Sequence, residues 1–268
     1  MKGRVLIIAG SDPSGGAGIQ ADIKTVTMLG GYAAAAITSL TVQNTLGVQS
    51  VHPVAPAVIR AQIEAVLEDI GADAIKIGMI GEAGAAAAIA ETLEAHACGV
   101  PIILDPVLAA TSGGALAAPE MVPMLMKRLL PLAALVTPNA DEAAALTGLA
   151  MRGEEDLAAA GALLMKAGAK AALVKGGHLP GAIVSDALVT RDGAHFFRNP
   201  RIETTSTHGT GCTLASAVAT GIAKGLPLEK AVERAIAFVR AAMRAAPGFG
   251  KGCGPLGHAQ ASERGRDD

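Results

Sequence analysis

The 268-residue chain contains no tryptophan, one tyrosine and four phenylalanines, although 51% of its residues are hydrophobic. A core without bulky rings has to be built from Ala, Val, Leu, Ile and Met. That supply fits alanine-rich helices packed closely on a sheet rich in the β-branched residues that strands favour. The length is enough for one large α/β domain or two small ones.

The sequence also has no excess of charge, since 22 basic and 24 acidic residues leave a net charge of −2. Such a chain has no broad basic field to attract nucleic acid or anionic lipid, and neither is expected as a partner. An anionic substrate therefore has to be held by local donors, a metal ion or a single lysine.

Long apolar runs and paired cysteines are missing as well. The first apolar run, Val5–Ala9, is too short for the core of a signal peptide, and no charge-free stretch is long enough to span a membrane. The three cysteines, Cys98, Cys212 and Cys253, are odd in number and far apart, so they indicate neither a disulfide framework nor a zinc site. These absences predict a reduced protein of the cytoplasm without a membrane segment.

What the sequence does contain is an alternation of short β-branched runs with longer alanine-rich periodic stretches. Strands are predicted at Val5–Ala9, Ala33–Leu40, Ala74–Ile77, Ile102–Leu104, Leu135–Thr137 and Ala171–Val174. Helices are predicted at Ile19–Leu29, Pro56–Asp69, Glu82–Ala97, Met121–Leu130, Asp141–Leu146 and Glu154–Ala167. This order is typical of an α/β fold with a largely parallel central sheet and helices on both faces.

The pattern changes in the last third of the chain. The runs Ile183–Thr190 and His195–Arg198 flank an Asp-Gly turn and predict an antiparallel hairpin. Two helices follow, the second at Leu228–Ala245, and the polar end at residues 259–268 is expected to be disordered. No linker or repeat interrupts the chain, which predicts one domain over residues 1–258.

Polar clusters follow several predicted strands, at the sheet edge where α/β proteins bind ligands. The glycine-rich loop at residues 10–18, GSDPSGGAG, matches neither the dinucleotide fingerprint nor the P-loop, so a tight structural turn stays an alternative. Gln43, in TVQNT, has an amide that can hold the edge of a heterocycle at two points, and the alternative is a turn or capping role.

A second group of polar residues follows the later strands. Asp105, Asn139 and Glu142 offer the oxygen ligands that suit Mg²⁺. Asn139 and Glu142 also match a helix capping box, which is the alternative. Lys175, followed by two glycines, can meet a phosphate or can simply be solvated.

The stretch STHGTGC at residues 206–212 precedes a predicted helix. Gly209, Thr210 and Gly211 would direct free N–H groups of the helix N-terminus at an anion. Cys212 would then lie in a positive field that lowers a thiol's pKa from about 8.5 toward neutrality, and a thiolate can accept a proton from an attacking hydroxyl. The alternative is a small thiol that packs under the loop. Together, these clusters supply the parts of a kinase that phosphorylates a small alcohol.

Seven stretches carry a resemblance to one family: AGSDPSGGAGIQADIKT, TVQNTLGVQSV, KIGMI, ILDPV, TPNADEA, LVKGGH and THGTGCTLASA. From about Arg4 to His258, the chain resembles the hydroxymethylpyrimidine/phosphomethylpyrimidine kinases of the ribokinase-like superfamily. The resemblance implies a ribokinase-like fold with a short antiparallel edge. It also implies a homodimer that uses ATP and Mg²⁺ to phosphorylate 4-amino-5-hydroxymethyl-2-methylpyrimidine and then its monophosphate, in thiamin biosynthesis.

The resemblance also implies roles for site residues. Gln43 would pair with the aminopyrimidine and Lys175 would reach the ATP phosphates, whereas Cys212 would replace the aspartate base of related sugar kinases. The resemblance further implies that Gly10, Asp22, Met79 and Val107 line the substrate pocket and that Asn139, Glu142 and Asp105 surround Mg²⁺. Gly209, Thr210 and Gly211 would form the anion hole. Asn139 and Thr210 would also bind the nucleotide.

Two stretches depart from the family pattern. Thr111, in VLAATSG, stands where the family often has lysine, and residues 250–255 read GKGCGP where the family closes with Gly-His-Gly-x-Gly-Pro. Two other interpretations stay open. One is a pyridoxal or pyridoxine kinase, because close relatives accept that ring, and the other is a nucleotide-sensing binding protein without catalysis.

Overall fold

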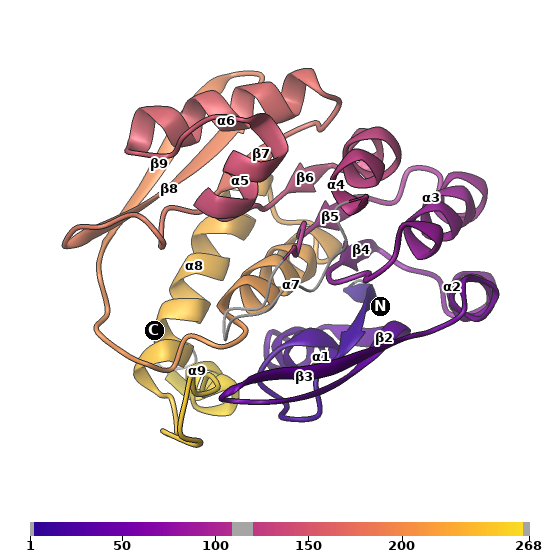
Figure 1. Cartoon of the computed structure of the whole chain (residues 1–268), viewed down its shortest axis with the longest axis horizontal. Helices are drawn as coiled ribbons and strands as arrows, with labels where there is room; N and C mark the ends of the chain where they lie inside the picture. The colour runs from indigo at the N-terminus through magenta and orange to yellow at the C-terminus, as the bar shows by residue number, and fades with distance from the viewer. Residues whose placement is uncertain (1–2, 109–119, 265–268) are drawn as a thin grey trace.

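The computed structural model describes residues 3–108 and 120–264, so Thr111 lies outside the described residues. Within them, nine strands form one sheet in the order β3-β2-β1-β4-β5-β6-β7-β8-β9 (Figure 1). The strands are β1 (Arg4–Ser11), β2 (Tyr32–Asn44), β3 (Gly47–Pro53), β4 (Ala74–Ile77), β5 (Ile102–Leu104), β6 (Leu135–Val136), β7 (Ala172–Val174), β8 (Ile183–Thr190) and β9 (Gly193–Pro200).

The sheet is parallel from β2 to β7 and antiparallel at both edges. The predicted parallel sheet and the hairpin, now β8 and β9, are confirmed. The second antiparallel edge, β3, was not predicted, because none of its residues is buried and no apolar alternation marks it. Gln43 therefore lies within β2, which continues to Asn44, and not in a loop beyond the strand.

Helices cover both faces of the sheet (Figure 1). They are α1 (Gly18–Met28), α2 (Pro56–Asp69), α3 (Ala83–His96), α4 (Met121–Met124), α5 (Ala140–Thr147), α6 (Glu154–Lys166), α7 (Thr210–Ala223), α8 (Leu228–Arg244) and α9 (His258–Arg264). The predicted helix at Met121–Leu130 begins as α4 and continues as a π-helical turn and a 3₁₀ turn. One core layer packs α2 to α6 on the sheet, and the other packs α1, α7, α8 and α9 on the opposite face.

Small residues allow the helices to approach their neighbours closely. A Cβ added to Gly221 of α7 would lie 2.9 Å from the methyl carbon of Ala231 in α8. Gly161 of α6 lies against Val189 of β8 in the same way. In a core almost without aromatic rings, glycine and alanine thus let neighbouring elements approach each other closely.

The end of the chain differs from the expected disordered tail. Residues His258–Arg264 form α9, in which Ala261 is 5% exposed and packs in the core layer of α1, α7 and α8. The expectation of disorder is therefore wrong for residues 259–264, because a buried alanine anchors an otherwise polar segment. Residues 265–268 lie outside the described residues.

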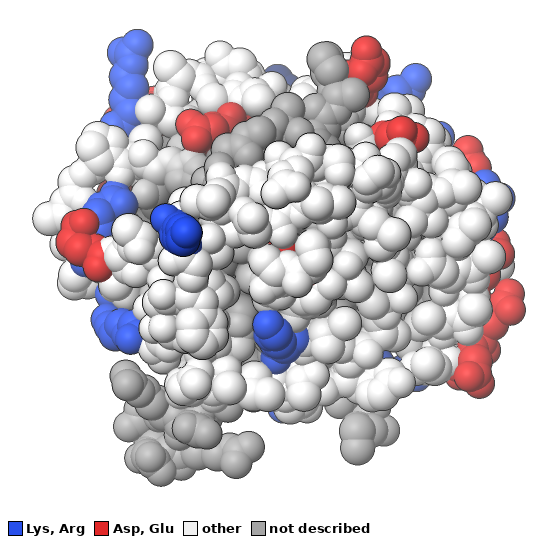
Figure 2. Space-filling model, turned by 60° about the horizontal axis from the view of Figure 1, so that its bottom comes forward, with Lys and Arg blue, Asp and Glu red and all other residues white. Residues whose placement is uncertain are grey.

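On the face shown in Figure 2, Lys and Arg side chains are scattered among neutral ones and form no continuous basic surface. In the part of the chain that the structure describes, no helix combines the length and the apolar character that crossing a membrane requires. All three cysteines are free thiols.

Candidate active site

The carboxyl ends of the parallel strands and the N-terminus of α7 border a cavity of about 440 Å³. Parallel strands bring the residues that follow them to one edge of the sheet, which is why distant sequence clusters meet there. The sequence-predicted site residues that line the cavity are Gly10, Gln43, Met79, Asp105, Val107, Asn139, Glu142, Lys175, Gly209, Thr210, Gly211 and Cys212. Asp22 does not line it and lies buried behind it.

The first turn of α7 forms the anion-binding part of the cavity. The helix begins at Thr210 after Gly209, which has a φ of 83° and provides no side-chain cap. A Cβ at Gly209 would overlap the carbonyl of Gly16, so only glycine allows this helix start to lie against the glycine-rich loop. The open N-terminus presents backbone N–H groups and the positive end of the helix dipole to an anion.

Lys175 faces Asp105 across the cavity end of the sheet. Its Nζ lies 3.1 Å from Asp105 Oδ1, which also accepts a hydrogen bond from Thr137 Oγ1 at 3.1 Å. A Cβ on Gly211 would lie 3.1 Å from Lys175 Nζ, so the missing side chain lets the start of α7 approach this pair. Burial alone would lower the pKa of Lys175, but the carboxylates of Asp105 and Glu142 raise it above its usual value.

The turn after Lys175 is fixed by Asp186, which the sequence analysis missed. Gly176 N–H donates to Asp186 Oδ1 at 2.9 Å. Gly176 also lies so close to the Ser185 carbonyl that a Cβ would overlap it. Burial raises the pKa of Asp186, although this hydrogen bond and the charge of Lys175 oppose the rise. The strand β8 thus holds Lys175 at the cavity through contacts that no local pattern reveals.

Asn139 and Glu142 form the capping box of α5. Asn139 Oδ1 accepts from Glu142 N–H at 2.8 Å, and a Glu142 oxygen accepts from Asn139 N–H at 2.8 Å. The capping interpretation is therefore confirmed. It occupies the amide oxygen of Asn139, which leaves the amide NH₂ as a donor toward a ligand.

Glu142 combines its capping contact with a position on the cavity wall. Burial raises its pKa to about 7, and the nearby carboxylate of Asp105 adds to the rise. Among the described residues, no group of three His, Cys, Asp or Glu side chains could hold a metal ion. Asp105 and Glu142 are nevertheless two carboxylates on the cavity wall whose charges repel each other, and such oxygen ligands fit Mg²⁺, which completes its shell with water and phosphate oxygens.

Cys212 lies in the first turn of α7, partly buried. Burial raises the pKa of its thiol to about 11, because the charge of Lys76 does not fully compensate and the carboxylates of Asp22 and Asp105 add to the rise. The expected shift toward neutrality is therefore wrong. Desolvation and two nearby carboxylates outweigh the field of the helix N-terminus.

Asp22 and Lys76 form an ion pair behind Cys212 that the sequence analysis did not recognise. Lys76 Nζ lies 2.8 Å from Asp22 Oδ2, and neither side chain is exposed. Ser216 of α7, one helical turn after Cys212, donates to Asp22 Oδ1 at 2.7 Å. Burial would lower the pKa of Lys76, but Asp22, Cys212 and Asp105 raise it above its usual value. A lysine inside the buried run AIKI was the signal that could have revealed the pair.

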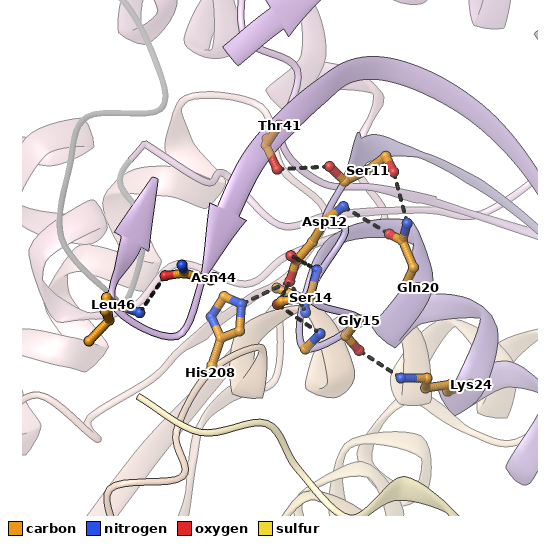
Figure 3. Close-up of polar contacts among 12 residues, drawn as sticks. Ser11, Asp12, Ser14, Gly15, Gln20, Lys24, Thr41, Asn44, Leu46 and His208 are labelled. Atoms are coloured by element: carbon orange, nitrogen blue, oxygen red, sulfur yellow. Dashed lines mark hydrogen bonds and ion pairs between the residues drawn. The ribbon is translucent and has the colours of Figure 1, made fainter. Parts of the chain in front are cut away.

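The glycine-rich loop after β1 is organised by Asp12 (Figure 3). Its carboxylate accepts hydrogen bonds from the N–H groups of Ser14 and Ala17, each at 2.8 Å. His208 Nε2 lies 2.8 Å from Asp12 Oδ2 (Figure 3). Burial would raise the pKa of Asp12, but these hydrogen bonds bring it to about 2. The loop is thus a polar turn that also lines the cavity, and the Asp-Pro-Ser-Gly sequence was its signal.

Comparisons with known proteins agree with this geometry. The model of the phosphomethylpyrimidine kinase family matches residues 12–257. The hydroxymethylpyrimidine/phosphomethylpyrimidine kinase of Salmonella typhimurium is 47% identical over 215 residues, which is 80% of this chain and 80% of that protein.

Two solved structures extend the agreement to the fold. The phosphomethylpyrimidine kinase of Clostridium difficile has a TM-score of 0.79 at 38% identity, over 88% of this chain and 97% of that chain. The pyridoxal kinase of Staphylococcus aureus, in complex with AMP-PCP and pyridoxal, has a TM-score of 0.89 at 32% identity. The match covers 97% of this chain and 94% of that chain. The fold is accordingly that of the ribokinase-like kinases, and this chain belongs to the phosphomethylpyrimidine kinase family.

Proposed function

We propose that this chain transfers a phosphoryl group from ATP to 4-amino-5-hydroxymethyl-2-methylpyrimidine and then a second one to the resulting monophosphate. Family membership makes the chain a kinase of thiamine biosynthesis. The observation that carries the proposal is a single cavity that joins a heterocycle-sized substrate side, at Gln43, to a phosphate side, at Lys175 and the start of α7.

The phosphate side holds the nucleotide. Lys175 meets the transferring phosphate, the amide NH₂ of Asn139 donates to it, and the open N-terminus of α7 stabilises charge that develops on its oxygens. Glu142 and Asp105 would hold Mg²⁺, which neutralises phosphate charge when bound. The proposed roles of these groups are supported by their shared position on the cavity wall.

Cys212 is the proposed base for the first transfer. As the hydroxymethyl oxygen bonds to the γ-phosphorus and the bond from that phosphorus to ADP breaks, the thiolate accepts the hydroxyl proton. With a pKa of about 11, only a small fraction of the thiol is ionised at neutral pH. The charge of Lys76 favours that fraction. The rate of the first transfer is therefore expected to rise with pH below the pKa of the thiol.

The substrate side lies at the carboxyl ends of β1 and β2, where Gly10 and Gln43 line the cavity. Gln43 presents an amide donor and acceptor that match a pyrimidine ring nitrogen and its exocyclic amine. Because Gly10 has no side chain, Met79 can pack against it in the cavity wall. A Cβ at Gly10 would lie 3.1 Å from the sulfur of Met79. A pyridoxal ring has a phenolic oxygen in place of the amine and can satisfy the amide only in part.

The proposed enzyme is a homodimer of the cytoplasm, where ATP is available. Leu40, Val42 and Leu46 of the β2–β3 hairpin are 50%, 44% and 65% exposed, and a second copy could cover this apolar surface. Light scattering after size exclusion should give about twice the 26.6 kDa of one chain. A monomer at micromolar concentration would argue against the dimer.

The function is tested by incubating the protein with ATP and Mg²⁺ and with the pyrimidine alcohol or pyridoxal, followed by mass spectrometry of the products. The proposal predicts a pyrimidine monophosphate that is converted to the diphosphate. Phosphorylation of pyridoxal alone would identify a pyridoxal kinase. Nucleotide binding without any product would identify a binding protein.

A further inference from the structure

His208 has one ring nitrogen that no protein group satisfies. The residue is 3% exposed and lines the cavity immediately before the start of α7. Its Nε2 is held by Asp12, whereas Nδ1 is buried without a hydrogen-bond partner among the described residues. In Figure 3, this second nitrogen points away from Asp12. Buried polar atoms are nearly always hydrogen-bonded, so an unpaired one at a cavity indicates a ligand partner.

The surroundings of Nδ1 favour an anionic partner. The contact with the Asp12 carboxylate requires a proton on Nε2, so Nδ1 is an acceptor in the neutral ring and a second donor in the imidazolium. His208 adjoins the N-terminus of α7, whose dipole and free N–H groups favour negative charge. Gly16 keeps space for the ring, because a Cβ there would overlap His208 Cδ2. An oxygen anion binds Nδ1 when this nitrogen carries a proton, that is, in the imidazolium, whose positive charge then lies between the Asp12 carboxylate and the anion.

The sheet order places this nitrogen on the substrate side. Asp12 follows β1, next to β2 with Gln43, whereas Lys175 follows β7, and β4, β5 and β6 separate β1 from β7. The phosphates of ATP already have Lys175 and the start of α7 as partners. In the second transfer, the phosphate of the monophosphate is itself the attacking group, so it has to lie beside the γ-phosphate near the start of α7, which His208 directly precedes.

We propose that His208 Nδ1 binds the phosphate of the monophosphate substrate and so serves the second phosphorylation specifically. The inference rests on the proposed function, because only that function supplies a phosphorylated substrate. Asp12 acts through His208 as a positioning residue that holds the ring.

The decisive variant is His208→Gln, because a glutamine amide nitrogen can replace Nε2 at Asp12 while nothing replaces Nδ1. The kcat/KM for the monophosphate is expected to fall roughly 10- to 100-fold, as for the loss of one hydrogen bond to a charged group. The kcat/KM for the pyrimidine alcohol should stay within about threefold. Lys24→Met is the matched control, since it removes a contact of the same loop, at the Gly15 carbonyl, without involving Asp12 or His208, and should affect both steps equally.

Equal losses in both steps for His208→Gln would overturn the inference, since they indicate a structural role or a contact with ATP. An unchanged second step would overturn it as well. If His208→Gln does not fold, ¹⁵N NMR of the wild-type histidines decides: the monophosphate, but not the alcohol, should shift Nδ1 of His208. A wild type that phosphorylates neither substrate would instead contradict the proposed function.

Discussion

Two aspartate–lysine pairs lie near the start of α7, and they differ in their access to the cavity. The Asp22–Lys76 pair spans 2.8 Å and neither side chain is exposed. The Asp105–Lys175 pair spans 3.1 Å, but Lys175 is 14% exposed and both residues line the cavity. We call Asp22–Lys76, which no solvent reaches, the closed pair, and Asp105–Lys175, which lines the cavity, the open pair.

The difference in access separates scaffold from chemistry. The closed pair is shielded from ligands, so its role is structural. Asp22 of α1 binds both Lys76 of β4 and Ser216 of α7 and so holds these three elements together. In the open pair, Lys175 can exchange its contact with Asp105 for a phosphate, and Asp105 can exchange its contact with Lys175 for a cation. Cys212 interacts with both pairs, because the charges of Lys76, Asp22 and Asp105 all act on the pKa of its thiol.

The largest expected effect comes from Cys212, the residue on which both pairs act. Cys212→Ala should lower kcat for the pyrimidine alcohol by roughly 10²- to 10⁴-fold, the size of a lost general base. It should also remove the rise of kcat with pH that a thiol pKa of about 11 predicts.

The second phosphorylation is the internal control for this variant. A phosphate monoester has a second pKa of about 6 and is already an anion at neutral pH, so it needs no base. Cys212→Ala should therefore spare the second step, whereas His208→Gln spares the first. Near-full turnover of the alcohol would show that the thiol only packs under the loop.

Breaking the closed pair should lower the stability of the fold. Lys76→Met leaves the Asp22 charge buried and unpaired, which is expected to lower the free energy of unfolding by about 3–5 kcal/mol. Urea denaturation measures the loss, and Asp22→Leu combined with Lys76→Met should recover much of it. A loss below about 1 kcal/mol, the range of a surface pair, would contradict the closed-pair account.

Breaking the open pair should act on catalysis before stability. Lys175→Met is expected to lower kcat by roughly 10²- to 10³-fold, as for the loss of one group that stabilises transition-state charge, and to raise the KM for ATP. Its effect on unfolding should be clearly smaller than that of Lys76→Met, because water reaches the cavity. Unaltered ATP kinetics would place Lys175 outside the reaction.

Glu142→Gln should give the smallest change. Glutamine keeps the capping box of α5, so the free energy of unfolding should change by less than about 0.5 kcal/mol. Loss of the carboxylate charge should raise the Mg²⁺ concentration needed for half-maximal turnover. Glu142→Ala is the comparison, since it also removes the cap and should cost about 1 kcal/mol. An unchanged Mg²⁺ requirement would leave Glu142 with its capping role alone.

Local patterns predicted most of the fold, because strands and helices that pack on the sheet repeat apolar residues at fixed spacing. The elements that were missed lack that signal. Strand β3 has no buried residue, and α9 is anchored by Ala261. Their structure depends on a partner elsewhere in the chain.

The site shows the same division. Gln43, Lys175 and the Gly-Thr-Gly turn could be found because each follows or ends a strand or begins a helix in a recognisable pattern. The missed contacts are tertiary: Lys76 meets Asp22 from 54 residues away, and His208 meets Asp12 from 196 residues away. Burial, and then the distant carboxylates of Asp22 and Asp105, raise the pKa of Cys212, so the local helix field alone gave the wrong direction.

If the open pair and the start of α7 phosphorylate an aminopyrimidine held by Gln43, the choice of substrate should depend on the amide of Gln43. This dependence is measured as kcat/KM for the pyrimidine alcohol and for pyridoxal, in the wild type and in Gln43→Leu. An unpaired buried amide costs about 1–3 kcal/mol, so the wild type should prefer the pyrimidine by roughly 5- to 150-fold, and the variant should narrow that ratio. A wild-type preference for pyridoxal, or a ratio that Gln43→Leu does not move, would contradict the account.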